Sequence, residues 1–328
     1  MKIIIPGGNG QVGRMLTRAF LKSGDECVIL TRTPSARAST EPDPRLREVA
    51  WDGRTLGPWA TELEGADVVI NLAGRSVNCR YGERNLAEMM DSRVESTRVI
   101  GAAIAAANRP PRVWLQASTA TLYAHRFDAP NDEATGIIGG HEPGVPALWA
   151  KSIAIAKAWE AEIVAAPTPS TRKVILRSAM TMSPDRGGVF HILAGHCRLG
   201  FGRFGNGRQY VSWIHEHDFV AAIRFLIARE NLNGAFNLAA PEPLPNRDFM
   251  EELHTAVGRR LSIPVPRWAL ELGTFFLRTE TELVLKSRRV IPTRLLESGF
   301  EFRYPDWRSA SAELIRQQFG KIQIQNPG

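Results

Sequence analysis

Residues 3–13 read Ile-Ile-Ile-Pro-Gly-Gly-Asn-Gly-Gln-Val-Gly, and this stretch predicts a strand, a glycine-rich turn and a helix. The three isoleucines are typical of a fully buried parallel strand, and the residues after 13 carry apolar side chains at helical spacing. In such a turn, Gly7 allows the tight bend, Gly10 lets a pyrophosphate approach the backbone, and Gly13 lets the helix pack closely on the strand. The pattern therefore predicts a dinucleotide site made of Gly7, Gly10, Gln11, Val12 and Gly13.

A second buried strand, residues 27–30, indicates which dinucleotide binds. It ends at Thr31 and Arg32, roughly 20 residues past the glycines, where an acidic residue would bind the 2′-hydroxyl of NAD. Arg32 stands there instead, and a guanidinium suits a 2′-phosphate, as does Arg37 if its loop folds back. We therefore expect NADP(H), with a solvated loop charge as the alternative role of Arg32.

The composition is that of a soluble globular protein, with 44% hydrophobic and 23% charged residues in 328. No charged-then-apolar signal precedes the first strand, and no apolar run approaches the ~18 residues that a membrane helix needs. We expect a cytoplasmic protein with no membrane partner. Cys27, Cys79 and Cys197 are odd in number and far apart, so we expect neither a disulfide framework nor a metal site.

The formal charge of +7 raises the question of nucleic-acid binding. The arginines, however, are scattered through every segment and often stand beside acids, with no basic stripe interleaved with aromatic residues. We expect no nucleic-acid partner. A basic surface can instead attract an anionic small substrate, although ordinary solubility is the favoured explanation of the charge.

Alternating strands and helices predict the fold class. Buried-strand runs recur at 3–5, 27–30, 47–51, 67–72, 112–117 and 173–177, with helical periodicity at 83–107 and 151–166. This alternation is typical of an α/β fold, a doubly wound parallel (Rossmann) sheet. After about residue 180, glycine- and proline-rich loops indicate a smaller C-terminal α+β domain. We expect residues 1–180 to form the NADP-binding domain, with 205–240 returning to it, and 181–328 to form the smaller substrate domain.

Several motifs together resemble a known family. They are the Gly7–Gly13 turn, Trp51-Asp52, Asn71-Leu72-Ala73-Gly74, the 91–98 helix, Ser212–His215 with Asp218, and Ser287–Pro292. The chain resembles the extended short-chain dehydrogenase/reductases, and among them the atypical epimerase-like family with a C-terminal domain of unknown function. The resemblance implies that Asp52, Leu72, Ala73 and Gly74 line the cofactor. Arg75 departs from the family, where an acid commonly follows the Asn-Leu-Ala-Gly turn.

Well-characterised extended members carry out hydride chemistry with a Ser or Thr, a Tyr, and a Lys four residues after that Tyr. None of the four tyrosines here has such a lysine. Depending on the alignment, the Tyr position holds Trp149 or Ser152, and the Lys position holds Ile153 or Ala156. The chain therefore lacks the Tyr-x-x-x-Lys dyad, a loss that the atypical family shares.

The resemblance places the substrate-polarising hydroxyl at Thr119 or, with one residue of slip, at Ser118. Lys151, or Lys157 further along the same helix, is a candidate to contact the cofactor ribose, with an ordinary solvated helical lysine as the favoured alternative. His125 and His215 have a suitable intrinsic pKa for proton transfer, and His215 is better placed by motif, although a structural role as a loop anchor is favoured for it. Arg208, in a glycine-rich segment, is a candidate anion clamp for the substrate.

These observations favour an NADP(H)-binding atypical oxidoreductase that acts on a small-molecule or nucleotide-linked substrate. One alternative is a catalytically silent NADPH-sensing regulator or scaffold, which the missing dyad motivates. Another is a nucleotide-sugar epimerase, which needs a proton-shuttling residue that the sequence does not reveal. By analogy with related extended proteins, pairing of the 83–107 helices suggests a homodimer.

Overall fold

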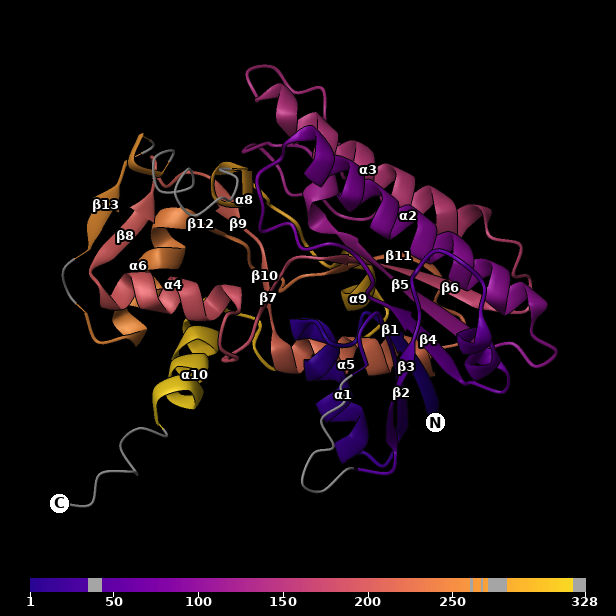
Figure 1. Ribbon diagram of the computed structural model, residues 1–328. Helices are drawn as coiled ribbons and strands as arrows, with labels where there is room; N and C mark the ends of the chain where they lie inside the picture. Colours follow the sequence, from indigo (N-terminus) through magenta and orange to yellow (C-terminus); the bar gives the residue numbers. More distant parts are fainter. Residues whose placement is uncertain (35–42, 260–261, 267, 271–281, 321–328) are drawn as a thin grey trace.

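A computed structural model describes residues 1–34, 43–259, 262–266, 268–270 and 282–320. Its centre is a seven-stranded sheet in the order β11-β6-β5-β4-β1-β2-β3 (Figure 1). Every neighbouring pair is parallel. The strands are β1 (Lys2–Pro6), β2 (Glu26–Thr31), β3 (Leu46–Ala50), β4 (Val68–Asn71), β5 (Val113–Thr119), β6 (Arg172–Ser178) and β11 (Gly234–Leu238). The predicted α/β fold is confirmed.

Helices cover both faces of this sheet (Figure 1). On one face lie α1 (Gln11–Lys22), α5 (Glu216–Ala228) and α9 (Thr293–Glu297), and on the other lie α2 (Glu83–Ala106), α3 (Ala147–Ala165) and the short 3-10 helix η1 (Pro58–Leu63). Ile3 and Ile5 join the first core, whereas Ile4 joins the second, because successive side chains of a strand point to opposite faces. The continuous isoleucine run is thus explained by burial on both sides.

The direction of strand order reverses between β1 and β4. In doubly wound sheets, ligands bind beyond the carboxyl ends of the strands at such a point. Two turns meet there. The Gly7 N–H donates to the carbonyl of Leu30 at 3.0 Å, and the Leu72 N–H donates to that of Pro6 at 2.9 Å. The glycine-rich turn therefore lies between the ends of β2 and β4, the position at which doubly wound sheets bind ligands.

A smaller lobe lies beside the sheet (Figure 1). It contains α4 (Val189–Arg198), α6 (Asn246–Ala256), α10 (Trp307–Phe319), and the strands β8 (Phe201–Phe204) and β13 (Ile263–Val265). Three two-stranded pairs accompany it: β7 (Met180–Met182) with β10 (Trp213–His215), β9 (Tyr210–Val211) with β12 (Leu244–Pro245), and β8 with β13. Its core is aromatic, and Trp307 stacks on Phe249 with ring centroids 4.0 Å apart.

The two parts are interwoven along the chain. After β10, the chain returns to the main sheet as α5 and β11. The segment that begins with α8 (Glu282–Leu285) also returns, since Leu295 of α9 and Phe300 pack in the main core. On its way it passes the 3-10 helix η2 (Ala120–Leu122), which follows β5, and there the Lys286 ammonium donates to the Thr121 carbonyl at 2.8 Å. The residues that follow α8 thus lie over the carboxyl end of β5.

Over the described ranges, none of the helices combines the length and the apolar character required to traverse a bilayer. The same ranges contain no group of three or more His, Cys, Asp or Glu side chains arranged to hold a metal ion.

Candidate functional site

Three glycines of the first turn differ in what surrounds them. Gly7 has a φ of +75°, and a Cβ there would lie 2.9 Å from the backbone of Ala73. A Cβ on Gly13 would lie 2.3 Å from the Gly8 carbonyl oxygen. Gly10, by contrast, would bring its Cβ near only one atom, the Gly7 carbonyl oxygen at 3.5 Å. Packing therefore requires glycine at 7 and 13, whereas position 10 borders open space that a ligand can fill.

The start of α1 offers hydrogen-bond donors next to this space. Gly10 is its N-cap, no side chain caps the helix, and the first turn contains no acidic residue. The first backbone N–H groups of a helix have no partner within it and carry a partial positive charge. The Gln11 amide nitrogen Nε2 is also buried without a hydrogen-bond partner among the described residues. Open space, free donors and positive potential together fit a pyrophosphate.

At the end of β2, the turn and the strand are tied together by Asn9, whose amide donates to the Thr31 hydroxyl at 3.1 Å. Arg32 follows and is exposed, so its guanidinium is accessible to a ligand. Arg37 lies outside the described residues. Asp52 follows β3, and its carboxylate accepts from the Thr55 hydroxyl at 2.6 Å and from two backbone N–H groups. The Thr55 hydroxyl, with these amides, lowers the pKa of Asp52 to about 2.

Two buried side-chain amides, those of Asn71 and Gln116, hold the turn after β4 in place. Asn71 donates to the Gln116 side-chain oxygen at 3.0 Å and accepts from the Ala73 N–H at 3.1 Å. These bonds fix Leu72, Ala73 and Gly74 against the glycine turn. The assignment of these residues to the cofactor stays a prediction, but the structure brings the two turns into contact. Arg75 forms an ion pair with Glu88 of α2.

The two hydroxyls at the end of β5 have different surroundings. Ser118 is buried and donates to the Glu160 carboxylate at 2.6 Å; Arg177 binds the same carboxylate through two nitrogens, at 2.9 and 2.8 Å. Thr119 is half-buried and accepts from the Thr121 N–H at 3.1 Å, which caps η2. In the described part of the chain its hydroxyl proton has no acceptor. Thr119 therefore retains a donor for a substrate, whereas the Ser118 hydroxyl belongs to a buried ionic network.

On α3, the positions of the missing dyad are occupied as follows. Trp149 is buried with its ring edge-on to that of His125, centroids 5.2 Å apart. Ile153 and Ala156 are buried apolar residues. Ser152 is half-buried, and its hydroxyl lies 2.8 Å from a carboxylate oxygen of Glu282. Lys151 and Lys157 are exposed on the same helix.

His125 lies beside this helix with one ring nitrogen engaged. Its Nδ1 accepts from the Ser287 N–H at 2.8 Å, so any ring proton of the neutral form is on Nε2. Burial lowers the pKa of His125. His125 therefore anchors the segment after α8 to the end of β5.

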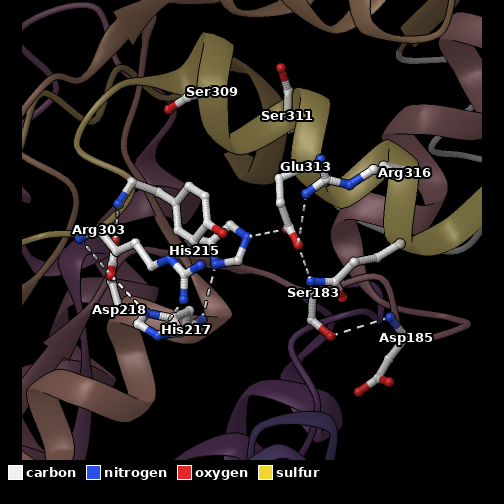
Figure 2. Close-up of polar contacts among 12 residues, drawn as sticks. Ser183, Asp185, His215, His217, Asp218, Arg303, Ser309, Ser311, Glu313 and Arg316 are labelled. Atoms are coloured by element: carbon white, nitrogen blue, oxygen red, sulfur yellow. Dashed lines mark hydrogen bonds and ion pairs between the residues drawn. The ribbon is translucent and has the colours of Figure 1, made fainter.

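His215 ends β10 and forms the N-cap of α5 (Figure 2). Its Nδ1 accepts from the His217 N–H at 3.0 Å, and its Nε2 lies 2.9 Å from the Glu313 carboxylate of α10. The ring is 1% exposed and stacks on Tyr304, with centroids 4.0 Å apart. Burial lowers the pKa of His215. Nδ1 thus caps α5 and Nε2 holds α10, so both nitrogens make structural contacts; the choice between proton transfer and loop anchoring stays a prediction.

Asp218, in the first turn of α5, makes further contacts with the C-terminal segment (Figure 2). Its buried carboxylate accepts from the backbone N–H groups of Arg303 and Tyr304 at 3.0 and 2.9 Å. Arg208 is exposed in the turn after β8, away from these contacts, and its backbone N–H donates to the Asn206 side chain at 3.0 Å. Its role as an anion clamp stays a prediction.

Sequence reasoning missed two residues that the structure brings to the end of β5. Glu282 and Lys286 are almost fully buried beside Ser152 and η2, although four-residue spacing of opposite charges is ordinarily a solvated helix pair. No local signal distinguishes them, because only the return of the C-terminal segment over η2 buries them.

A parallel sheet with a glycine-rich turn at the point where its strand order reverses defines a dinucleotide-binding Rossmann protein. The model of the NAD dependent epimerase/dehydratase family matches residues 3–239, and the chain belongs to this family. A domain of unknown function, DUF1731, matches residues 265–314.

Relatives match over nearly the full length. The chain is 28% identical over 319 residues to human epimerase family protein SDR39U1, covering 96% of this chain and 100% of that protein. It is 30% identical over 316 residues to epimerase family protein MW0731 of Staphylococcus aureus, covering 96% and 99%. The crystal structure of human SDR39U1 (isoform 2) with NADPH has a TM-score of 0.81 at 27% identity, covering 96% of this chain and 99% of that chain. The epimerase-like resemblance is confirmed.

Proposed function

We propose that this protein binds NADP(H) and transfers hydride to or from a small-molecule or nucleotide-linked substrate without a Tyr-Lys dyad. The observation that carries the proposal is the open space over Gly10, next to the uncapped start of α1. The exposed Arg32 at the end of β2 supports the phosphorylated cofactor, because a guanidinium binds phosphate through parallel hydrogen bonds. Human SDR39U1, which is similar over the whole chain, was crystallised with NADPH.

In this proposal the chain holds the cofactor at three places. The Gly7–Gly13 turn receives the pyrophosphate, Arg32 binds the 2′-phosphate, and Leu72–Gly74 line the cofactor site beyond. When bound, the cofactor supplies or accepts the hydride. Thr119 donates its free hydroxyl proton to the substrate oxygen and so stabilises charge that develops there.

A comparison of four nucleotides tests the cofactor assignment. We would titrate the protein with NADPH, NADP⁺, NADH and NAD⁺ by calorimetry, with Arg32→Ala and, as a matched control, Arg229→Ala at the exposed end of α5. Loss of charge-assisted hydrogen bonds worth about 1.5–3 kcal/mol predicts roughly ten- to hundredfold weaker NADPH binding for Arg32→Ala, with NADH binding unchanged. Equal affinity of the wild type for NADPH and NADH would contradict the proposed specificity.

A second experiment separates an oxidoreductase from a silent NADPH sensor. The sensor is favoured if the Tyr position is that of Trp149, whose buried indole cannot take up a proton. Loss of NADPH absorbance is followed with a panel of small aldehydes and ketones. An oxidoreductase consumes NADPH, and Thr119→Val lowers turnover while leaving NADPH affinity nearly unchanged. A sensor binds NADPH with no consumption across the panel.

A further inference from the structure

A buried group of ionisable side chains lies at the end of β5, outside the cofactor turn. It forms where the segment that starts with α8 crosses η2 and α3. The Glu282 side chain is 2% exposed and that of Lys286 is 0% exposed. Ionised side chains are rarely buried this deeply without a structural or chemical reason, because their removal from water is costly.

The contacts form a line from the surface of α3 into this group. The Ser152 hydroxyl lies within hydrogen-bond distance of two acceptors, Glu282 Oε1 at 2.8 Å and the Trp149 carbonyl of the same helix at 2.9 Å. The same carboxylate oxygen lies 3.5 Å from Lys286 Nζ, which donates to the Thr121 carbonyl at 2.8 Å. Ser152 is half-buried, so it is the member of this line that a substrate can contact.

One polar atom in the group has no hydrogen bond. Glu282 Oε2 is buried and has no partner among the described residues. An unsatisfied buried oxygen of this kind costs about 1–3 kcal/mol. A donor from a ligand satisfies this oxygen, whereas protonation removes the buried negative charge, so the deeply buried carboxyl favours gaining a proton.

The surrounding charges set this proton affinity. Burial raises the pKa of Glu282, while Arg288 and Lys286 oppose the shift. Burial lowers the pKa of Lys286 to about 8, with Glu282 and Glu142 opposing it and Arg288 reinforcing it. Tyr81 and His125 also face the group. Groups whose pKa values are displaced toward neutrality suit proton transfer near neutral pH.

The position of this buried group in the fold suits a catalytic role. Thr121 comes two residues after Thr119, at the carboxyl end of β5, the edge of a doubly wound sheet where ligands bind. Ser152 stands on α3 at one of the two positions that the alignment gives to the missing Tyr. The cluster thus combines a hydroxyl, a carboxyl and an amine near the position of the missing dyad.

We propose that Ser152, Glu282 and Lys286 form a proton relay that replaces the Tyr-Lys dyad, an inference that rests on the proposed oxidoreductase function. Ser152 is the catalytic residue, and Glu282 and Lys286 are positioning residues. A substrate hydroxyl gives its proton to Ser152 Oγ as Ser152 gives its own to Glu282 Oε1. Two O–H bonds break and two form, and the transferred proton ends on the buried Glu282 carboxyl. In the carbonyl-reducing direction the same steps run in reverse.

Turnover with the aldehyde and ketone panel tests the relay, with NADPH affinity measured for every variant. Ser152→Ala and Glu282→Gln are expected to lower turnover by about 10²–10⁴-fold, the usual contribution of general acid-base catalysis. Ser152→Thr, which restores a hydroxyl, is expected to recover most of that loss. Retained NADPH affinity shows that each variant is folded.

The pH profile distinguishes proton transfer from a structural role. Carbonyl reduction needs Glu282 in its protonated form, so loss of this proton sets the basic limb of the profile. Without its cation, Lys286→Met disfavours the Glu282 carboxylate, so the basic limb moves to higher pH by about 1–3 pH units. Lys22→Met, an exposed lysine at the end of α1, is the matched control and leaves the profile unchanged. A second readout uses ¹³C-labelled lysine: Glu282→Gln should lower the Lys286 pKa measured by NMR.

The results that would overturn the relay differ from those that would overturn the proposed function. Wild-type turnover in Ser152→Ala, or an unshifted pH profile in Lys286→Met, overturns the relay while leaving the proposed function intact. A wild type that binds NADPH but converts no substrate overturns the proposed function, and the relay with it. An unchanged Lys286 titration in Glu282→Gln also overturns the relay, independently of any substrate.

Discussion

Gly7 and Gly10 belong to one turn, yet alanine should affect different properties at the two positions. At Gly7 it should lower the stability of the protein, and at Gly10 it should weaken NADPH binding. At Gly7, alanine adopts a φ of +75°, which costs about 1–2 kcal/mol, and its Cβ lies 2.9 Å from backbone atoms of Ala73 that cannot move aside easily. Such overpacking costs about 1–3 kcal/mol more. We therefore expect Gly7→Ala to lower the free energy of unfolding by about 2–5 kcal/mol.

At Gly10 the backbone is already extended, with a φ of −69°, and the added Cβ meets one atom at the ordinary distance of 3.5 Å. Stability should therefore change by less than about 1 kcal/mol. The methyl group fills the space over the turn, however, and keeps a phosphate from the N–H groups of α1. Loss of about 1.5–3 kcal/mol of charge-assisted hydrogen bonding predicts roughly ten- to hundredfold weaker NADPH binding.

Urea denaturation monitored by tryptophan fluorescence measures stability, and calorimetry measures NADPH affinity. The reasoning holds if Gly10→Ala is stable and binds weakly, and if Gly7→Ala is markedly destabilised without ligand. Wild-type NADPH affinity in Gly10→Ala would show that the pyrophosphate does not lie over this turn. Wild-type stability in Gly7→Ala would refute the packing argument.

Three further substitutions test the buried polar contacts by denaturation. Arg177→Met should cost about 3–5 kcal/mol, because it leaves the Glu160 carboxylate, 13% exposed, without its cation; a loss below about 1 kcal/mol would show that water replaces it. His215→Ala should cost about 2–4 kcal/mol through loss of the α5 cap and of the Glu313 bond, without weakening NADPH binding. Burial lowers the pKa of His215, so the contribution of its neutral ring to the free energy of unfolding is fully present above about pH 6.5. This contribution is lost as the pH falls through the folded-state pKa, a pH dependence of stability that His215→Ala should lack. Asp306→Ala should cost about 1 kcal/mol, because the Ser309 N–H at the start of α10 loses its cap, and an unchanged midpoint would contradict that role.

The sequence determined the features that depend on near neighbours in the chain. Ile3–Ile5 predict a buried strand because burial on both faces leaves no place for polar residues, and β1 confirms it. The glycines at 7, 10 and 13 indicate a strand-to-helix turn because that geometry requires residues without side chains. The predicted strands at 27–30 and 173–177 lie within β2 and β6, and the one at 112–117 overlaps β5 in all but its first residue, for the same local reasons.

Only the tertiary structure decided which polar side chains meet. Ser152 and Glu282 are 130 residues apart, and His215 and Glu313 are 98 apart. Their partnerships depend on where α8 and α10 return to the sheet, and no local pattern encodes that placement. Ser118 and Thr119 are equivalent hydroxyls in the sequence, but packing of α3 directs Ser118 to Glu160 and leaves a donor on Thr119. Charge and hydroxyl chemistry are properties of the residue, whereas burial and partner choice arise from contacts between distant segments.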